Sequence, residues 1–256
     1  MTNRATGLKR LLIVPDTHVP FHDKKAFNLV LKVLNTIKFD RLVILGDFGD
    51  MYSVSGHLKD PDIADCIAEE ADAINAELDR LDHACKKSGV KDKTYIEGNH
   101  ENRLYRSVMA QMPSVRRLLR VDNLLRLKER GYGFKEYGDY HKEGKLHLTH
   151  DDGKAGPVAH IAAVNNFNGS VGIGHTHQMA MCYIGDVLDR RHVGAMFGWL
   201  GDKKSPVFNY AKTRSKQKNW QLGFGTALLK MDGTAFVHTN PIINYECEVW
   251  GQLIKL

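Results

Sequence analysis

The chain has little of what secreted and membrane proteins require. Its 256 residues include four scattered cysteines, Cys66, Cys85, Cys182 and Cys247, without a CxxC pair or zinc-finger spacing. Such cysteines are expected to be reduced, structural thiols. No segment approaches the run of about 18 apolar residues that identifies a membrane-spanning helix. Residues 1–10 are polar and basic, unlike a signal peptide. We therefore expect a soluble, cytoplasmic protein without a membrane partner.

The sequence also lacks internal repeats, low-complexity tracts and an evident linker. Apolar residues make up 43% of it, which is ordinary for a globular protein and enough for a sizeable core. A length of 256 residues lies within the range of one large α/β domain. We expect a single domain over residues 1–256.

The net charge of +6 is unevenly distributed along the chain. One basic run is Arg103, Arg106, Arg116, Arg117, Arg120, Arg126, Lys128 and Arg130. A second is Lys203, Lys204, Lys212, Arg214, Lys216 and Lys218, with Phe208, Tyr210 and Trp220 interleaved. Cations next to aromatic faces favour single-stranded nucleic acid. An ordinary solvated basic surface above core aromatic residues produces the same pattern. Charge alone therefore does not decide between nucleic-acid binding and an ordinary surface.

The first half of the chain predicts alternating strands and helices. Short apolar runs at 11–14, 42–45 and 94–96 indicate buried parallel strands. Apolar residues at helical spacing predict one helix near 27–37 and another over 60–88. Asp60-Pro61 would begin the second helix and Ser88-Gly89 would end it. This order is typical of a largely parallel sheet with helices outside.

The second half is less regular. Residues 101–130 are predicted to be helical with an interruption at Pro113. Strands are expected at 145–149 and 171–173, with a helix over 158–167 between them. Residues 222–231 and 234–239 predict a hairpin across Asp232-Gly233.

Metal-binding residue types follow five predicted strands in succession. The segments are Asp16-Thr17-His18, Gly46-Asp47-Phe48-Gly49-Asp50, Gly98-Asn99-His100-Glu101, His150, and Gly174-His175-Thr176-His177. Ligands bind beyond the carboxyl ends of strands in open α/β sheets. Each segment alone has an ordinary explanation as a cap or a turn. Together they indicate a site for borderline divalent cations, because carboxylate, imidazole and amide groups suit such ions.

These segments resemble the ordered motifs of the calcineurin-like metallophosphoesterases: D-x-H, G-D-x-x-D, G-N-H-[DE], a later His and G-H-x-H. The resemblance extends from Asp16 to His177 and so covers most of the chain. It implies an α/β fold with two packed mixed β-sheets flanked by helices, a four-layer α/β/β/α sandwich, in which the later strands form the second sheet. It also implies hydrolysis of a phosphate ester by water held between two metal ions.

The same resemblance implies a role for each matched residue. Asp16, His18 and His177 would bind the first metal, Asp47 would bridge the two, and Asn99, His150 and His175 would bind the second. His100 would be the general acid or the transition-state stabiliser near the leaving oxygen, and Asp50 would orient it. Two divalent ions are implied, with Mn²⁺ the first choice and Fe, Zn or Ni as alternatives.

Two departures from the family pattern bear on the substrate and the ligands. Met51 stands where the protein-phosphatase branch has a phosphate-binding Arg, which argues against a phosphoprotein phosphatase. Arg103 and Arg106 are the candidates to bind substrate instead. Asp151 and Asp152 intervene between His150 and the following Gly153, so His147 is the alternative ligand to His150.

Three functions remain open from the sequence. The favoured one is a phosphodiesterase or nuclease acting on nucleic acid or nucleotides. The alternative is a small-molecule phosphomonoesterase. The third is a non-catalytic binding protein on the same fold. The sequence names neither the substrate nor the oligomeric state.

Overall fold

The computed structural model describes residues 7–56, 59, 63, 66–209 and 219–256. A six-stranded sheet has the strand order β11-β10-β1-β2-β3-β4. Strands β1 (Lys9–Val14), β2 (Arg41–Ile44), β3 (Asp92–Ile96) and β4 (Tyr132–Lys135) run parallel to one another. Strand β10 (Gly223–Leu229) is antiparallel to β1, and β11 (Ala235–Pro241) is antiparallel to β10. The predicted β-α-β-α-β order is therefore confirmed.

A five-stranded sheet has the order β5-β6-β7-β9-β8. Strands β6 (Leu146–Thr149), β7 (Ser170–Ile173) and β9 (Arg191–Phe197) are parallel, whereas β5 (His141–Glu143) and β8 (Met179–Gly185) are antiparallel to their neighbours. Both sheets are mixed, as predicted. The expectation that all later strands join the second sheet is wrong. The predicted hairpin β10–β11 pairs with β1, and β12 (Glu246–Val249) and β13 (Gln252–Lys255) form a separate hairpin.

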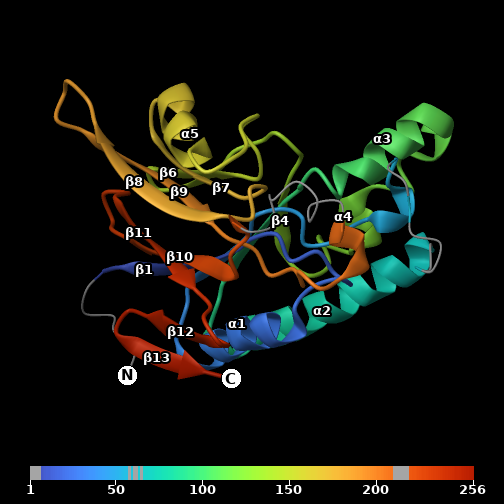
Figure 1. The fold of residues 1–256 in the computed structure, drawn as a ribbon, viewed down its shortest axis with the longest axis horizontal. Coiled ribbons are helices and arrows are strands. Elements are labelled where there is room, and N and C mark those ends of the chain that lie inside the picture. Colours follow the sequence, from blue (N-terminus) through green and yellow to red (C-terminus); the bar gives the residue numbers. More distant parts are fainter. Residues whose placement is uncertain (1–6, 57–58, 60–62, 64–65, 210–218) are drawn as a thin grey trace.

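The two sheets pack face to face between helical layers (Figure 1). Strand β1 shows how the sequence produces this arrangement. Its alternate residues Leu11 and Ile13 pack in the core between the sheets, while Leu12 and Val14 pack against the helices on the other side. Helices α1 (Lys24–Thr36) and α2 (Ile67–Ser88) cover the first sheet, and α5 (Ala159–Phe167) covers the second. The predicted four-layer α/β fold is therefore confirmed.

The helix boundaries agree only in part with the sequence-based prediction. Helix α2 ends at Ser88, followed by Gly89 at φ 94°, as predicted. Its predicted start is wrong, because the helix begins at Ile67 after Cys66, and Ile63 lies outside it. Asp60 and Pro61 lie outside the described residues.

The basic stretch after β3 forms short helices around an interruption, as expected. They are α3 (Asn102–Gln111), the 3₁₀ turn η3 (Pro113–Val115) and α4 (Val121–Leu124). Further 3₁₀ turns are η2 (Tyr52–Val54) and η4 (Pro206–Phe208). None of the described helices is long and apolar enough to span a membrane.

Candidate metal centre

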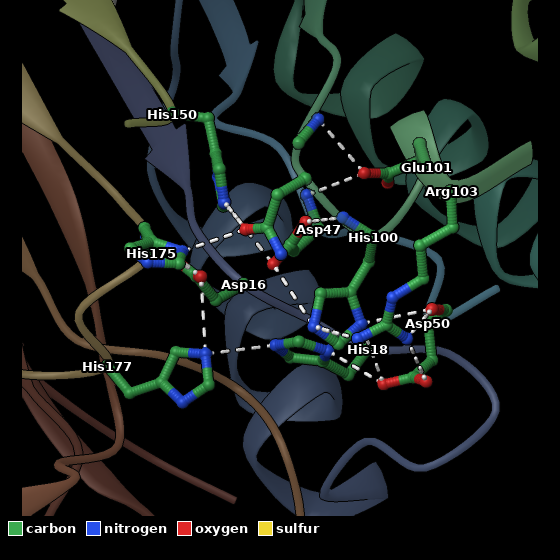
Figure 2. Close-up of polar contacts among 12 residues, drawn as sticks. Asp16, His18, Asp47, Asp50, His100, Glu101, Arg103, His150, His175 and His177 are labelled. Atoms are coloured by element: carbon green, nitrogen blue, oxygen red, sulfur yellow. Dashed lines mark hydrogen bonds and ion pairs between the residues drawn. The ribbon is translucent and has the colours of Figure 1, made fainter. Parts of the chain in front are cut away.

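The predicted metal ligands meet where strands of both sheets end (Figure 2). Strands β1, β2 and β3 of the first sheet and β6 and β7 of the second each lead into one group of them. The residues are Asp16, His18, Asp47, Asn99, His150, His175 and His177. Parallel strands place their carboxyl ends at one edge of a sheet, which explains how segments far apart in sequence converge here.

Asp16, His18 and His177 form the first group of candidate ligands, with ligand atoms within 4.8 Å of one another. The Nε2 atoms of His18 and His177 face each other at 3.0 Å. His177 Nε2 also lies 3.4 Å from Asp16 Oδ1. All three side chains are buried, so these groups have little access to water.

Asp47, His150 and His175 form the second group, and Asn99 joins it through its amide oxygen. Asn99 Oδ1 lies 2.9 Å from His150 Nε2 and 2.8 Å from His175 Nδ1. His150 Nε2 is 3.2 Å from Asp47 Oδ2. His150 Nδ1 donates to the Leu45 carbonyl at 2.8 Å, which leaves Nε2 as the nitrogen that faces the centre.

The alternative ligand His147 does not reach this group. Its ring centroid lies 4.5 Å from that of Phe167, and it belongs to none of the candidate ligand groups in the described chain. Asp151, the residue after His150, is bound elsewhere, because its Oδ2 accepts the Tyr137 hydroxyl at 2.9 Å. The structure therefore brings His150, and not His147, to the centre.

Backbone strain is concentrated at these residues. Five of them have φ values between 27° and 62°, in the left-handed region that side chains rarely adopt. They are Asp16, His18, Asp47, His175 and His177. Each such residue costs about 1–3 kcal/mol, and strain of this kind persists where a functional geometry demands it.

Glycine allows the loops to approach closely. A Cβ at Gly98 would overlap both the backbone nitrogen and the carboxylate of Asp47. A Cβ at Gly46 would overlap the His150 ring, and its φ of 88° also favours glycine.

Burial and neighbouring charges act differently on the two groups. Burial lowers the pKa of His18 to about 4 and that of His177 well below its usual value, so both imidazoles are neutral. Burial opposes ionisation of Asp47, but His100 and His150 outweigh it and hold its pKa well below the usual range. The Asp47 charge in turn outweighs burial at His150 and raises its pKa to about 10. Burial raises the pKa of Asp16 to about 6.

His100 and Asp50 lie beside the first ligand group in the predicted arrangement. His100 Nδ1 donates to the Asp50 carbonyl oxygen at 3.0 Å and lies 3.2 Å from Asp50 Oδ2. The same Oδ2 accepts from His18 Nδ1 at 3.0 Å, so one carboxylate orients two rings. His100 Nε2 is 3.8 Å from Asp47 Oδ2.

The two predicted substrate-binding arginines occupy different positions. Arg103 donates through Nη2 to His100 Nε2 at 2.9 Å and through Nη1 to the Asp50 carbonyl at 3.0 Å. Arg106 is exposed and makes no hydrogen bond or ion pair with any residue that the structure describes. Arg103 therefore belongs to the centre, whereas Arg106 lies at its periphery.

The sequence did not reveal the role of Glu101. This fully buried carboxylate accepts the backbone N–H groups of Asp47, Gly49 and Gly98 at 2.9–3.0 Å. It also accepts the Tyr95 hydroxyl at 2.6 Å. Glu101 thus ties the loop after β2 to the loop after β3. Its position in the Gly98–Glu101 motif was the available signal.

A cluster of aromatic side chains packs against the histidines of the first ligand group. Trp199 stacks on His177, with ring centroids 4.8 Å apart and an interplanar angle of 15°. Phe208 lies 5.4 Å from the His18 ring, and Trp220 lies 4.5 Å from the His177 ring. Phe208 and Trp220 are buried, so using them as exposed stacking faces for nucleic acid is wrong. Tyr210, Lys212, Arg214, Lys216 and Lys218 lie outside the described residues.

The donor set fits two divalent cations. It consists of carboxylate and amide oxygens and imidazole nitrogens, without a thiolate, as borderline ions prefer. The neutral rings of His18 and His177 face each other through Nε2 at 3.0 Å, so a cation between them could bind both nitrogens. The Asn99 amide oxygen lies close to His150 Nε2 and His175 Nδ1, so a second cation could bind these three atoms. Asp47, held ionised, belongs to the second group, and its charge also acts on Asp16 and His177 of the first.

No family model and no curated protein matches the sequence. Similar solved structures include vacuolar protein sorting 29 from Cryptosporidium parvum, with 13% identity and a TM-score of 0.46 over 90% of this chain and 96% of that chain. A single mutant of Vps29 from Entamoeba histolytica has 13% identity and a TM-score of 0.43 over 95% of both chains. Purple acid phosphatase PPD1 from yellow lupin seeds has 11% identity and a TM-score of 0.42 over 91% of this chain and 52% of that chain. These likenesses are distant, and no function is taken from them.

Proposed function

We propose that this chain hydrolyses phosphate esters with the help of two divalent cations, and that its preferred substrates are phosphodiesters such as nucleotides or nucleic acid. One observation carries the proposal: ionised, buried Asp47 belongs to one candidate ligand group and acts electrostatically on Asp16 and His177 of the other. Asp16, His18 and His177 would hold one ion. Asn99, His150 and His175 would hold the other, and Asp47 would contact both.

Two bound cations would lower the pKa of a water molecule and neutralise the oxygens of the phosphate group. The protein residues would hold the ligand atoms in place. Asp50 accepts from His18 Nδ1, which leaves His18 Nε2 free to bind. The Leu45 carbonyl fixes the His150 ring in the same way. Such outer hydrogen bonds orient metal-binding imidazoles and increase their affinity.

His100 would transfer the proton to the leaving oxygen. Its Nδ1 is held by Asp50, so Nε2 is the atom available to the substrate. Arg103 donates to that Nε2 at 2.9 Å, and an incoming phosphate would offer its guanidinium a better acceptor. Binding of substrate would thereby free Nε2 to take up the proton that it passes on, and it would place a cation beside the phosphate. Burial lowers the pKa of His100, but Asp47 and Asp50 outweigh it and raise the pKa, which favours the protonated ring.

The surface beside the centre supports an anionic substrate. Arg106, Arg116 and Arg117 are exposed on the segment that starts with helix α3. This segment begins immediately after His100 and Glu101, so the chain that leaves the centre carries exposed cations. They would attract a polyanion in a salt-dependent manner.

The test is hydrolysis in the presence of Mn²⁺ of p-nitrophenyl phosphate, its bis-ester, a 2′,3′-cyclic nucleotide, and single- and double-stranded DNA. We expect turnover of the diesters. His100→Ala should reduce kcat by about 10²–10⁴-fold, the usual contribution of a general acid. Asp47→Asn should lose both metal and activity.

Asp139→Asn makes the same carboxylate-to-amide change at an exposed site and serves as the control. Turnover of the monoester alone would replace diesters with phosphomonoesters as the substrate class. Activity that survives Asp47→Asn, or a purified protein that binds no divalent ion, would contradict the proposal and favour a non-catalytic binding protein.

A further inference from the structure

A cavity beside the segment that follows β3 has no role in the proposed chemistry. It has a volume of about 250 Å³ and is lined by residues of α3 and α4 and of the end of β4. Its lining combines aromatic faces with charged groups. The lining includes Glu97, Asn102, Tyr105, Arg116, Phe134 and Tyr137.

The cavity continues the edge of the sheet that carries the metal ligands. Ligands follow β1, β2 and β3, and β4 is the next strand in the sheet. Glu97 and Asn102, which line the cavity, flank the turn that contains Asn99 and His100, so the cavity lies beside the segment that carries these residues to the centre. Tyr137, another lining residue, donates its hydroxyl to Asp151, the neighbour of His150, and so links the cavity wall to the segment that carries this candidate ligand.

Glu97 presents an acceptor to this cavity. Its side chain is largely buried, and its Oε2 accepts the backbone N–H of Tyr137 at 3.1 Å. Its other carboxylate oxygen accepts no hydrogen bond from the residues that the structure describes. A carboxylate oxygen that lines a cavity and has no protein donor can accept from a ligand, so the cavity favours a ligand that carries N–H groups.

Of the two arginines that line the cavity, Arg116 is the one available to stack on a flat ring. Arg120 is occupied by Asp122 at 2.8 Å and by Glu136 at 3.4 Å. Arg116 has no such carboxylate among the described residues and lies over the Tyr105 ring, 5.1 Å from its centroid. Tyr105, Phe134 and Tyr137 supply aromatic surface. Guanidinium and aromatic faces stack on heterocycles, whereas three lining carboxylates disfavour a phosphate group.

We propose that this cavity binds the nucleobase of a nucleotide ester whose phosphate lies at the candidate metal centre, with Glu97 accepting N–H groups of the base. The inference rests on the proposed function and specifies its substrate. A volume of 250 Å³ accommodates one ring system and excludes a helix or a second base. Guanine is the best match, because it offers two adjacent N–H donors to one carboxylate.

The experiment compares kcat/KM for the 2′,3′-cyclic nucleotides of guanine and uracil, each divided by the same protein's kcat/KM for bis(p-nitrophenyl) phosphate. Dividing by the bis-ester value cancels any effect of a substitution on the metal ions, because both substrates depend on them equally. We expect the guanine nucleotide to be preferred by at least about tenfold, as one good paired contact discriminates by about 1–3 kcal/mol. Glu97→Gln should abolish most of that preference, because its amide offers one acceptor oxygen where the carboxylate has two.

Calorimetric titration with guanosine, which has no phosphate, tests the cavity separately from hydrolysis. The parent should bind guanosine more tightly than Glu97→Gln does. Tyr105→Ala, at an exposed position, should also weaken binding. Glu129→Gln, an exposed carboxylate outside the cavity, is the matched control and should bind like the parent.

The outcomes separate the two proposals. Turnover of the bis-ester with no base preference and no guanosine binding would overturn the cavity assignment and leave the proposed function intact. Guanosine binding that requires Glu97 in a protein without hydrolytic activity would support the cavity and contradict the proposed function. Equal guanosine affinity of the parent and Glu97→Gln would overturn the assignment in either case.

Discussion

Glu101 accepts the backbone N–H of Asp47 at 2.9 Å, and through this bond a residue of one loop holds the proposed bridging ligand of another. The carboxylate makes three further contacts, with Gly49, Gly98 and Tyr95. We predict that Glu101→Gln weakens binding of the two metals by about 10–100-fold, the usual effect of losing a partner that orients a ligand loop. An amide cannot accept at both of its ends, so one N–H group would lose its acceptor.

Metal content after dialysis against graded chelator measures this prediction. Glu70→Gln is the control, because Glu70 is also a buried carboxylate that accepts backbone N–H groups, those of Tyr52 and Ser53. It should lower thermal stability with a smaller loss of metal. If Glu101→Gln keeps both metals at parental affinity, Glu101 does not position Asp47.

A methyl group at Gly98 should disable the centre. The Cβ of Gly98→Ala would collide with the Asp47 backbone and carboxylate, and backbone cannot move aside as a flexible side-chain end can. We expect metal binding to fall and the free energy of unfolding to drop by about 1–3 kcal/mol. Metal analysis and chemical denaturation measure the two effects. Gly185→Ala is the control, since its Cβ would meet open space. Normal metal binding by Gly98→Ala would show that the two loops are not tightly packed.

The arrangement of candidate ligands was predictable because it follows from local pattern. Short apolar runs identify the strands, and residues after parallel strands lie at one edge. The strand order therefore predicts that Asp16 and Asp47 lie close together, although neither segment alone predicts this. The later ligands His150 and His175 follow the same rule in the second sheet.

The remaining features depend on contacts that no local pattern contains. Strand β4 reads Tyr-Gly-Phe-Lys, which is neither an apolar run nor a clear alternation. The pairing of β10 with β1 joins segments more than 200 residues apart, so the hairpin was predictable but its partner was not. At helix α2, the Asp60-Pro61 signal did not set the start. The helix begins at Ile67, where Glu69 and Glu70 lie in the first turn and favour its positive end.

Trp199 should affect metal retention as well as stability. It is fully buried and stacked on His177, so Trp199→Leu would leave a cavity behind this ligand. We expect a loss in the free energy of unfolding smaller than the about 3–5 kcal/mol typical of a buried Trp→Ala truncation, and a metal content that falls from two ions toward one. Phe39→Leu, in the core beside Trp250 and away from the ligands, should reduce stability without that change in metal content. Two metals retained in a destabilised Trp199→Leu protein would limit Trp199 to a packing role.

Removal of metal should itself lower stability. Without cations the centre holds four buried carboxylates, those of Asp16, Asp47, Asp50 and Glu101, and several imidazoles in contact with one another. A ligand that binds only the folded state stabilises it by about 2.7 kcal/mol at a concentration 100 times its Kd. We expect the melting temperature to fall in EDTA and to recover with Mn²⁺. The Asp47→Asn protein, as the matched control, should respond little to either treatment. An equal response of both proteins would place the stabilising metal elsewhere.

Glu143 links the two sheets and predicts a specific pH dependence. It lies on β5 and forms an ion pair with Arg41 of β2, while His141 Nε2 lies 2.8 Å from its Oε1. Burial opposes its ionisation, but the hydrogen bonds with His141 and Arg41 outweigh it and lower the pKa of Glu143. A carboxylate whose pKa is lower in the folded state stabilises the fold above its unfolded pKa of about 4.3. That stabilisation is lost as the pH falls through the folded value.

Glu143→Gln should therefore reduce the free energy of unfolding by about 1–3 kcal/mol at pH 7. The difference from the parent should shrink as the pH falls below about 4, because the parental carboxylate is then protonated as well. Urea denaturation at pH 7, 5 and 3.5 measures this convergence. Glu246→Gln breaks the exposed pair with Lys255 and should cost less than about 1 kcal/mol at every pH. If the loss at Glu143 stays constant from pH 7 to 3.5, it arises from packing between the sheets and not from the charge.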